Sequence, residues 1–255
     1  MKRNWKLLNK LLGRKSNFSN NSFEVDGVSI DDEREICDHF NRFFINHPKE
    51  VHDSVPPYSN SYMDLLPSNV PDGIFEACTE IEVEAAICAL RKNGALEDIP
   101  RKFLLISNTF VSKFICQLFN LSLYQGYFPD SFKISKINPI FKKGRRDLLC
   151  NYRPISILIN LSKIFETLIF NRLSSHFVTN EFLSENQFGF RKHKSTELAV
   201  CELVTRTLPA IRDKKFAICV FLDFTACFDT VCRDILLAKL DRYGVRGCFF
   251  KLLQS

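Results

Sequence analysis

Asp223 is the residue of this chain with the clearest chemical potential, because it directly follows seven apolar residues, Phe216 to Leu222. A run of this kind, rich in β-branched and aromatic side chains, predicts a strand covered on both faces in the middle of a sheet. Such a strand would hold the Asp223 carboxylate rigidly at its end, and carboxylate oxygens are the ligands that a hard divalent cation prefers. Asp is also common in loops that follow strands, so this residue does not define a site without its neighbours.

The neighbours of Asp223 form a longer pattern. Residues 221–231 read Phe-Leu-Asp-Phe-Thr-Ala-Cys-Phe-Asp-Thr-Val, which resembles motif A of reverse transcriptases, specifically those of jockey-like non-LTR retrotransposons. Ala226 and Cys227 stand where Lys and Ala are usual. Other segments match the same family in order and spacing from about residue 133 onward. They are 138–144, 151–156, 161–166, 187–191 with Ser195 and Thr196, 234–237 and 243–247.

The resemblance implies an α+β fold, the fingers and partial palm of a right-hand polymerase preceded by a helical N-terminal extension. The expected division is 1–78 for the linker and helical extension, 79–210 for the fingers and 211–255 for the start of the palm. The family's second metal-binding motif, an aromatic residue followed by Ala-Asp-Asp, is not present before the last residue, Ser255. The full-length element is expected to add an endonuclease and the remaining palm and thumb.

By resemblance, Asp223 is the catalytic residue and a metal ligand, the backbone carbonyl of Phe224 assists it, and the cofactor is Mg²⁺ or Mn²⁺. Nucleotidyl transfer uses two cations about 4 Å apart, which hold the attacking 3′-oxygen and the leaving phosphate. Phe228 matches an aromatic ring that would collide with a ribose 2′-hydroxyl and so favour deoxynucleotides; its alternative role is that of an ordinary core Phe. Asp229 is expected to make local hydrogen bonds. The implied partners are an RNA template, a DNA primer and a dNTP.

Positive charge is concentrated in one part of the chain. The net charge is +6, and residues 133–153 alone hold seven basic residues and one acidic residue. A charge run is often only a solvated surface, but this one is interleaved with Phe141 and Tyr152, which favours phosphate binding. By resemblance, Lys142, Lys143 and Arg153 bind the incoming nucleotide, and Arg145, Arg146, Arg191 and Lys192 contact nucleic acid.

The predicted function is that of an RNA-directed DNA polymerase segment, which adds dNTPs to a primer 3′-hydroxyl. Because the second Asp motif is absent, the 255-residue chain alone is expected not to extend a primer. The alternative is an inactive truncated relic that binds nucleic acid through its basic loop, and the coding sequence after Ser255 would separate the two. A metal-dependent nuclease or phosphatase built on Asp223 is disfavoured, because no second cluster of acidic residues accompanies it.

The composition is that of a globular protein, with 45% apolar residues. The ten Cys are scattered without a Cys-x-x-Cys spacing, which indicates reduced and mostly buried thiols in an intracellular protein of the cytoplasm, the nucleus or both. No apolar run approaches the length that spans a bilayer.

Periodicity and capping residues predict helices first, then a basic hairpin, then further helices around the strand that ends at Leu222. The expected elements are a basic helix start within 1–22, a helix capped by Asp31 and Asp32, a helix with the capping box Thr79 to Glu82, a helix over 111–124 closed by Gly126, a strand over 134–141, a basic loop over 142–151, a returning strand over 154–159, a helix through Ile164 to Leu173, a turn at 187–191, a helix capped by Ser195, and a last helix capped by Asp234 and closed by Gly244.

Overall fold

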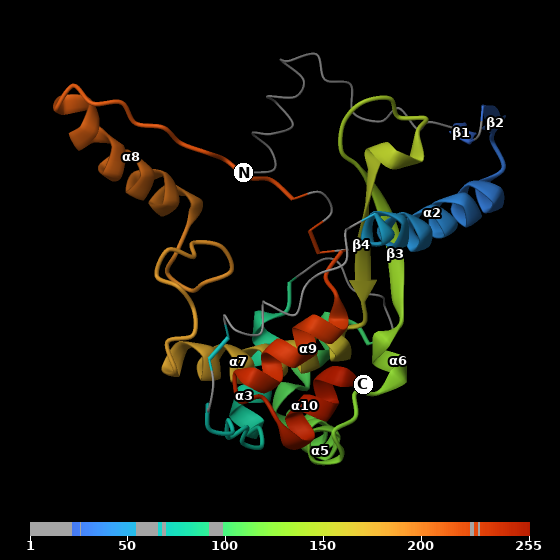
Figure 1. Cartoon of the computed structure of the whole chain (residues 1–255). Helices are drawn as coiled ribbons and strands as arrows, with labels where there is room; N and C mark the ends of the chain where they lie inside the picture. Colours follow the sequence, from blue (N-terminus) through green and yellow to red (C-terminus); the bar gives the residue numbers. More distant parts are fainter. Residues whose placement is uncertain are drawn as a thin grey trace. The chain divides into compact units, whose positions relative to one another are not determined.

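The computed structural model of the chain describes residues 22–25, 27–54, 66–67, 70–91, 99–224, 227–228 and 230–255 (Figure 1). These residues form helices and short strands, as the predicted α+β class requires. They belong to two compact units, one from Met1–Pro56 and Lys136–Ile157, the other from Pro57–Ser135 and Leu158–Ser255. The expected helix start within 1–22 lies outside the described residues, except for Ser22.

The first unit includes a small antiparallel hairpin that was not predicted from the sequence. Strands β1 (Phe23–Val25) and β2 (Val28–Ile30) pair so that Phe23 lies opposite Ile30. The turn between them contains Gly27 at φ +79°, a conformation that costs a glycine little. An Asp-Gly pair between two β-type segments is the signal that would have predicted this hairpin.

Helix α2 (Glu33–Asp53) follows and begins as predicted. The carboxylate of Asp32 accepts hydrogen bonds from the backbone N–H groups of Arg34 and Glu35, at 3.0 and 2.9 Å. These bonds satisfy donors that have no partner inside the first turn of a helix. Pro48 lies inside α2, which nevertheless continues to Asp53.

The predicted basic hairpin is the other part of this unit. Strands β3 (Ser135–Phe141) and β4 (Tyr152–Leu158) are neighbours in a two-stranded sheet. A single turn of 3₁₀-helix, η2 (Leu149–Asn151), ends the loop between them. The two strands therefore start and end within one or two residues of the predicted positions. Pro139 has no backbone N–H to donate, and it is accommodated because each strand of this two-stranded sheet has an unpaired edge.

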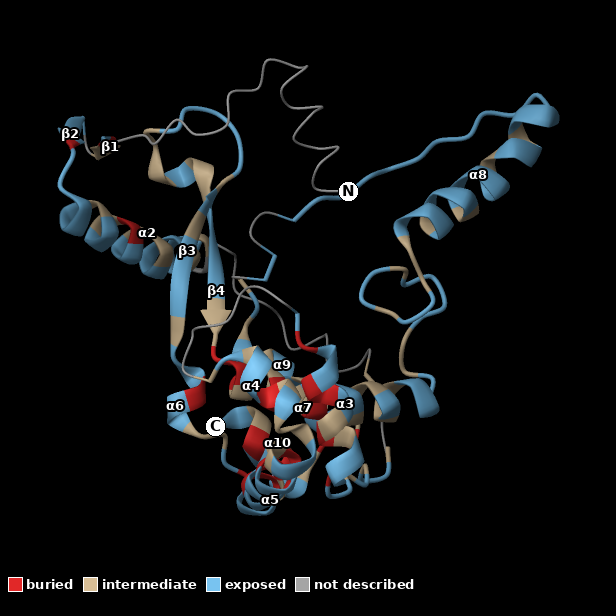
Figure 2. Cartoon of the chain, turned by 180° about the vertical axis from the view of Figure 1, so that it is seen from behind, coloured by how far each residue is buried: buried red, intermediate tan, exposed pale blue. Residues whose placement is uncertain are grey.

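The second unit is a cluster of helices around an apolar core. Its helices are α3 (Glu80–Ala89), α4 (Arg101–Ile106), α5 (Asn108–Gln125), α6 (Asp130–Lys133), α7 (Asn160–Thr179), α8 (Thr196–Arg212), α9 (Arg233–Arg242) and α10 (Gly247–Gln254). The fully buried side chains at the centre include Ile87, Leu104, Phe119, Phe165 and Leu168. Figure 2 shows buried residues gathered on α3, α5, α7 and α10, whereas α8 has none.

Local signals set the helix ends in this unit. Thr79 and Glu82 form the predicted capping box, in which Thr79 Oγ1 accepts from the Glu82 N–H at 3.3 Å and Glu82 Oε2 accepts from the Thr79 N–H at 2.8 Å. Gly126 closes α5 in the left-handed conformation, and Ser195 caps α8 through the Leu198 N–H. The prediction for Asp234 was wrong: Cys232 is the N-cap of α9, Asp234 lies in its first turn, and α10 follows as a further helix.

Residues 70–78 belong to the helical unit, although the sequence suggested only a connection before the helix at 79. The Phe75 ring stacks on Phe249 with centroids 4.0 Å apart, and the Gly73 N–H donates to Gly244 O at 2.7 Å. Asn120 forms hydrogen bonds with both the N–H and the carbonyl of Cys78. This segment is consequently fixed to α5 and α10 by specific contacts.

The segment Phe216–Leu222 differs from its prediction. It is not a strand, and its side chains are open to solvent: Phe216 is 99% exposed and Leu222 82%. A central strand needs neighbours that complete its hydrogen-bond ladder, and both sheets in the described part of the chain are two-stranded hairpins elsewhere. The prediction of a buried central strand is therefore wrong for this structure.

The cysteines also differ from their prediction. All ten are free thiols, as predicted, but only Cys78 and Cys116 are buried, because most of the others lie on solvent-facing sides of helices or in loops. The two buried sulfur atoms are 3.6 Å apart, and burial together with this contact raises the pKa of the Cys78 thiol to about 12. Among the described helices, none is both long and apolar enough to cross a membrane.

Candidate functional site

The basic loop has a defined conformation. The Lys142 N–H donates to Asn151 O at 2.8 Å and continues the pairing of β3 with β4. Gly144 has φ +91°, and a Cβ on it would lie 2.8 Å from the Asn151 side-chain nitrogen. The Asn151 side chain fills this space and donates to Arg145 O at 2.7 Å. Residues 142–151 therefore form a closed turn whose backbone conformation is set by these contacts.

Lys142, Lys143 and Arg153, the predicted nucleotide-binding residues, are all exposed on this hairpin. In the part of the chain that the structure describes, none of the three takes part in an ion pair. Unpaired cations on a rigid support are well suited to phosphate, since a guanidinium can bind two oxygens and an ammonium supplies a mobile point charge. The three residues can thus form a phosphate-binding surface.

Arg145, predicted to contact nucleic acid, is already occupied by two carboxylates. Its Nη2 lies 2.5 Å from Glu24 Oε2 and 2.6 Å from Asp147 Oδ2, and its Nε donates to Asp147 Oδ1 at 3.1 Å. These hydrogen bonds raise the pKa of Arg145 and hold the pKa of Asp147 below its usual value. Sequence reasoning missed Glu24, whose partner is 121 positions away in the chain.

Arg146 is also engaged within the hairpin. Its guanidinium lies over the Phe141 ring, 4.4 Å from the centroid, and its backbone carbonyl accepts a hydrogen bond from the Tyr152 hydroxyl at 2.7 Å. A cation over an aromatic face is attracted by the ring quadrupole. The side chain remains exposed, so its position on the β3 side of the loop is set while its charge stays accessible.

Asp223 and Phe224 belong to the second unit and are both exposed in the open segment described above. Asp223 takes part in no ion pair with the described residues, so its carboxylate is available as one metal ligand. The described residues contain no group of three or more His, Cys, Asp or Glu side chains that could hold a metal ion. They therefore do not make up a complete metal site, and Asp223 is a single candidate ligand.

Phe228 is 77% exposed and does not lie in the described core. Its ring meets that of Phe190 edge to face, with centroids 5.8 Å apart. Phe190 belongs to the predicted turn at 187–191 and has φ +59°. Two motifs that are far apart in the sequence are thus in contact. Asp229 lies outside the described residues.

Two basic residues, Arg191 and Lys194, hold the turn at 187–191 through contacts with residues 184 and 185. Arg191 donates to Ser184 O at 2.7 Å and lies 3.1 Å from Glu185 Oε1, while Lys194 lies 3.3 Å from Glu185 Oε2. Hydrogen bonds from Arg191 and then Lys194 hold the pKa of Glu185 below its usual value. Lys192 is exposed, so of the two predicted nucleic-acid contacts here it is the one with an accessible charge.

A cavity in the helical unit, about 540 Å³ in volume, lies beside the 161–166 motif. Lys163, Glu166 and Arg91 contribute charged side chains to its lining. Burial raises the pKa of Glu166 and lowers that of Lys163. The 161–166 motif contributed only to the family pattern, and its sequence alone indicated no role for Lys163 or Glu166.

The family described as reverse transcriptase (RNA-dependent DNA polymerase) matches residues 140–254. The probable RNA-directed DNA polymerase from transposon BS of Drosophila melanogaster is 34% identical over 160 residues, 60% of this chain and 17% of the relative.

Two further Drosophila melanogaster proteins are similar. The RNA-directed DNA polymerase from mobile element jockey is 37% identical over 131 residues, 51% of this chain and 14% of the relative. The probable RNA-directed DNA polymerase from transposon X-element is 31% identical over 202 residues, 74% of this chain and 21% of the relative. The chain thus spans about a fifth or less of the length of these relatives.

The matched residues 140–254 contain the basic loop, strand β4 and Asp223, and this part of the chain is a reverse transcriptase segment. The similar proteins include the RNA-directed DNA polymerases of transposon BS and mobile element jockey, which confirms the resemblance to jockey-like reverse transcriptases read from the motifs. Members of this family are enzymes that use divalent metal ions and act with a template and a primer. The comparisons do not favour the alternative of an inactive relic.

Proposed function

We propose that this chain provides the fingers and the beginning of the palm of an RNA-directed DNA polymerase. The reaction is the addition of deoxynucleotides to a primer 3′-hydroxyl, copied from an RNA template. The observation that carries the proposal is the hairpin of Lys142, Lys143 and Arg153, three exposed cations without ion-pair partners in the described residues, on a closed turn inside the family region.

The finer architecture is part of the same proposal. We assign 1–78 to an N-terminal linker and helical extension, 79–210 to the fingers and 211–255 to the start of a right-hand palm. The contacts of residues 70–78 with α5 and α10 support an extension that is joined to the polymerase by packing as well as by sequence. The proposed location is intracellular, in the cytoplasm, the nucleus or both.

The roles of individual residues follow from position and exposure. Asp223 is the proposed catalytic carboxylate and, with the backbone carbonyl of Phe224, the part of the Mg²⁺ or Mn²⁺ site that this chain contributes. Phe228 is the proposed selector of deoxynucleotides, and its exposed ring beside Phe190 is consistent with a surface open to a ligand. Arg146, Arg191 and Lys192 are proposed to lie along the nucleic acid.

The test is a measurement of nucleic-acid binding against salt concentration, for the chain and for K142Q/K143Q/R153Q. Each phosphate neutralised releases counterions, so the log–log slope changes by about 0.7 to 0.9 per contact. Loss of three contacts should lower the slope by about two to three. A K2Q/R3Q/K6Q variant loses the same charge at the other basic segment. Equal loss in both variants would show that only bulk charge matters and would refute the proposal.

A further inference from the structure

Residues 23–53 and the basic loop are joined by polar contacts in one compact unit. The Glu24 N–H donates to Asp147 O at 2.8 Å, and the Glu24 carboxylate lies 2.5 Å from Arg145 Nη2. The same guanidinium binds Asp147 through two nitrogens. Arg145 is therefore a bridge between strand β1 and the loop that carries the exposed lysines.

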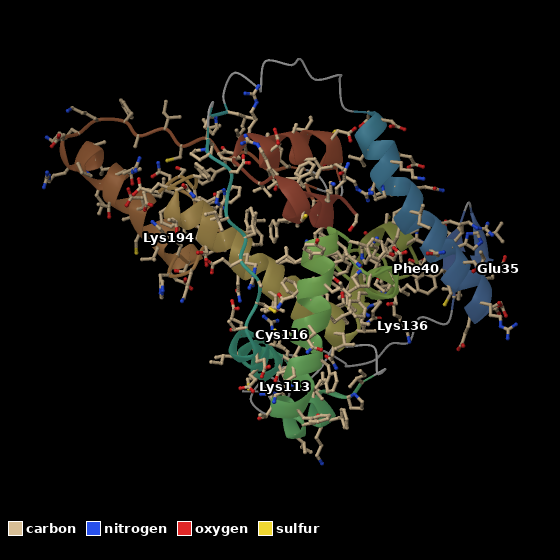
Figure 3. The ribbon with its side chains drawn as sticks, turned by 90° about the horizontal axis from the view of Figure 1, so that it is seen from below. Glu35, Phe40, Lys113, Cys116, Lys136 and Lys194 are labelled. Atoms are coloured by element: carbon tan, nitrogen blue, oxygen red, sulfur yellow. The ribbon has the colours of Figure 1, made fainter. Side chains whose placement is uncertain are left out.

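An aromatic cluster joins the elements that this bridge connects. Phe23 of β1, Phe40 of α2 and Tyr152 of β4 lie with ring centroids 5.1 to 5.6 Å apart, and Phe141 of β3 lies 5.5 Å from Tyr152. Figure 3 shows Phe40 on the side of α2 that faces the hairpin strands. Phe23 and Phe40 are both buried. Rings in such contacts fix the relative position of the elements that carry them.

We infer that Arg145 is a positioning residue, and that Glu24 and Arg145 together hold the basic loop in the conformation in which Lys142, Lys143 and Arg153 can bind phosphate. Residues 23–53 then act as a brace, which means that their contacts stabilise the conformation of the nucleotide-binding hairpin. The inference rests on the proposed function, because it concerns how the hairpin of that function is supported. It also replaces a direct nucleic-acid contact for Arg145 by an indirect role.

The two roles of Arg145 predict opposite effects of the Glu24 charge. If Arg145 bound phosphate, Glu24 would compete with the ligand, and its removal would strengthen binding. If Arg145 is a brace, removal of Glu24 loosens the loop and weakens binding, although the protein becomes more positive. The fork of a guanidinium can hold Glu24 and Asp147 at once, whereas an ammonium is a single point charge.

The first experiment compares E24Q with wild-type chain 1–255 in binding a fluorescent single-stranded oligonucleotide. We expect binding to weaken about two- to fivefold, the range for loss of an exposed ion pair that orders a binding site. D38N is the matched control, since Asp38 is an exposed acid of α2 that makes no ion pair with the described residues. It should strengthen binding slightly or leave it unchanged. Tighter binding by E24Q than by D38N would overturn the inference.

The second experiment uses R145K and R145Q. A brace predicts that R145K binds as weakly as E24Q, because the lysine keeps the charge but lacks the planar fork and the second nitrogen that bonds Asp147. It also predicts that R145Q has the salt slope of the wild type, since no phosphate contact is lost. A direct contact predicts near wild-type binding by R145K and a slope lower by about 0.7 to 0.9 in R145Q. That second pattern would overturn the inference.

Amide hydrogen exchange separates failure of this inference from failure of the proposed function. In E24Q we expect faster exchange at residues 142–152, with α5 unchanged as the internal reference. Fast loop exchange with no nucleic-acid binding by the wild type would refute the function but keep the brace. Unchanged loop exchange in E24Q would refute the brace and leave the function intact.

Discussion

The exposed segment Phe216–Leu222 gives the sharpest prediction about the behaviour of this chain in solution. Ile218, Val220 and Leu222 are 89, 78 and 82% exposed, and the segment pairs with no described strand. An extended apolar segment with unpaired backbone groups is a site for association with another chain. We therefore expect the wild-type chain to self-associate, and I218T/V220T/L222T to associate much less.

The magnitude follows from the number of side chains involved. Burial of a large aliphatic side chain contributes about 1.5 to 3 kcal/mol, so three side chains could contribute roughly 4 to 9 kcal/mol as an upper bound. Much of this is offset by lost translational freedom and by ordering at the interface. A weakening of self-association by at least about tenfold, equal to about 1.4 kcal/mol, is the expected result. The free energy of unfolding should change by less than about 0.5 kcal/mol, because the side chains are exposed.

The assay is sedimentation velocity over a concentration series, together with thermal unfolding of each variant. I106Q/F110Q/F114Q is the matched control, since these three side chains are also exposed and lie on α4 and α5. The control should retain most of the self-association. If I218T/V220T/L222T lowered stability as a core substitution does, the segment would be buried, and the exposed placement would be refuted. Equal effects of the two variants would show that association has no preferred site.

Two further predictions concern the helical unit. F165A should lower the free energy of unfolding by about 3 to 5 kcal/mol. The reason is that the Phe165 ring is fully buried among Phe119, Phe128 and Phe132. Denaturant titrations measure this change, and a loss below about 1 kcal/mol would contradict the placement of Phe165 in the core. Burial acts to raise the pKa of Glu82, but the Thr79 N–H and Arg172 outweigh it and hold the pKa below the ordinary 4.5. A lowered carboxyl pKa gives stability that is present above the unfolded value and is lost as the pH falls through the folded value. Unfolding of E82Q should therefore depend less on pH below 4.5 than unfolding of the wild type, and parallel pH profiles would refute this role of Glu82.

Local elements of this protein could be predicted because short-range interactions decide them. Asp32, Thr79 with Glu82 and Ser195 cap helices with their own side chains, and Gly126 ends a helix by its own backbone freedom. The basic hairpin was predicted for the same reason, since β3 and β4 pair across only ten residues. The motifs also predicted the family, and the match of residues 140–254 to reverse transcriptases confirms that prediction.

The residues around Asp223 show the limit of such prediction. A run of seven apolar residues has the composition of a central strand, but a strand is central only if other strands lie beside it. Hydrogen-bond partners of this kind are not a property of the run itself. The exposure of Phe216–Leu222 and of most cysteines has this common cause. Composition shows which side chains are apolar enough to be buried, but tertiary packing decides which of them are buried.

The sequence by itself determined the family, the helix ends at Asp32, Thr79, Gly126 and Ser195, and the position of the basic loop. Only the tertiary structure decided which charges of that loop are available. Arg145 and Lys143 are two residues apart and both basic, yet Arg145 is bound by Glu24 and Asp147, whereas Lys143 has no ion-pair partner among the described residues. Glu24 lies 121 positions before Arg145 and meets it because Phe23, Phe40 and Tyr152 pack together. Long-range packing of this kind depends on the whole arrangement of the unit, and no local pattern contains it.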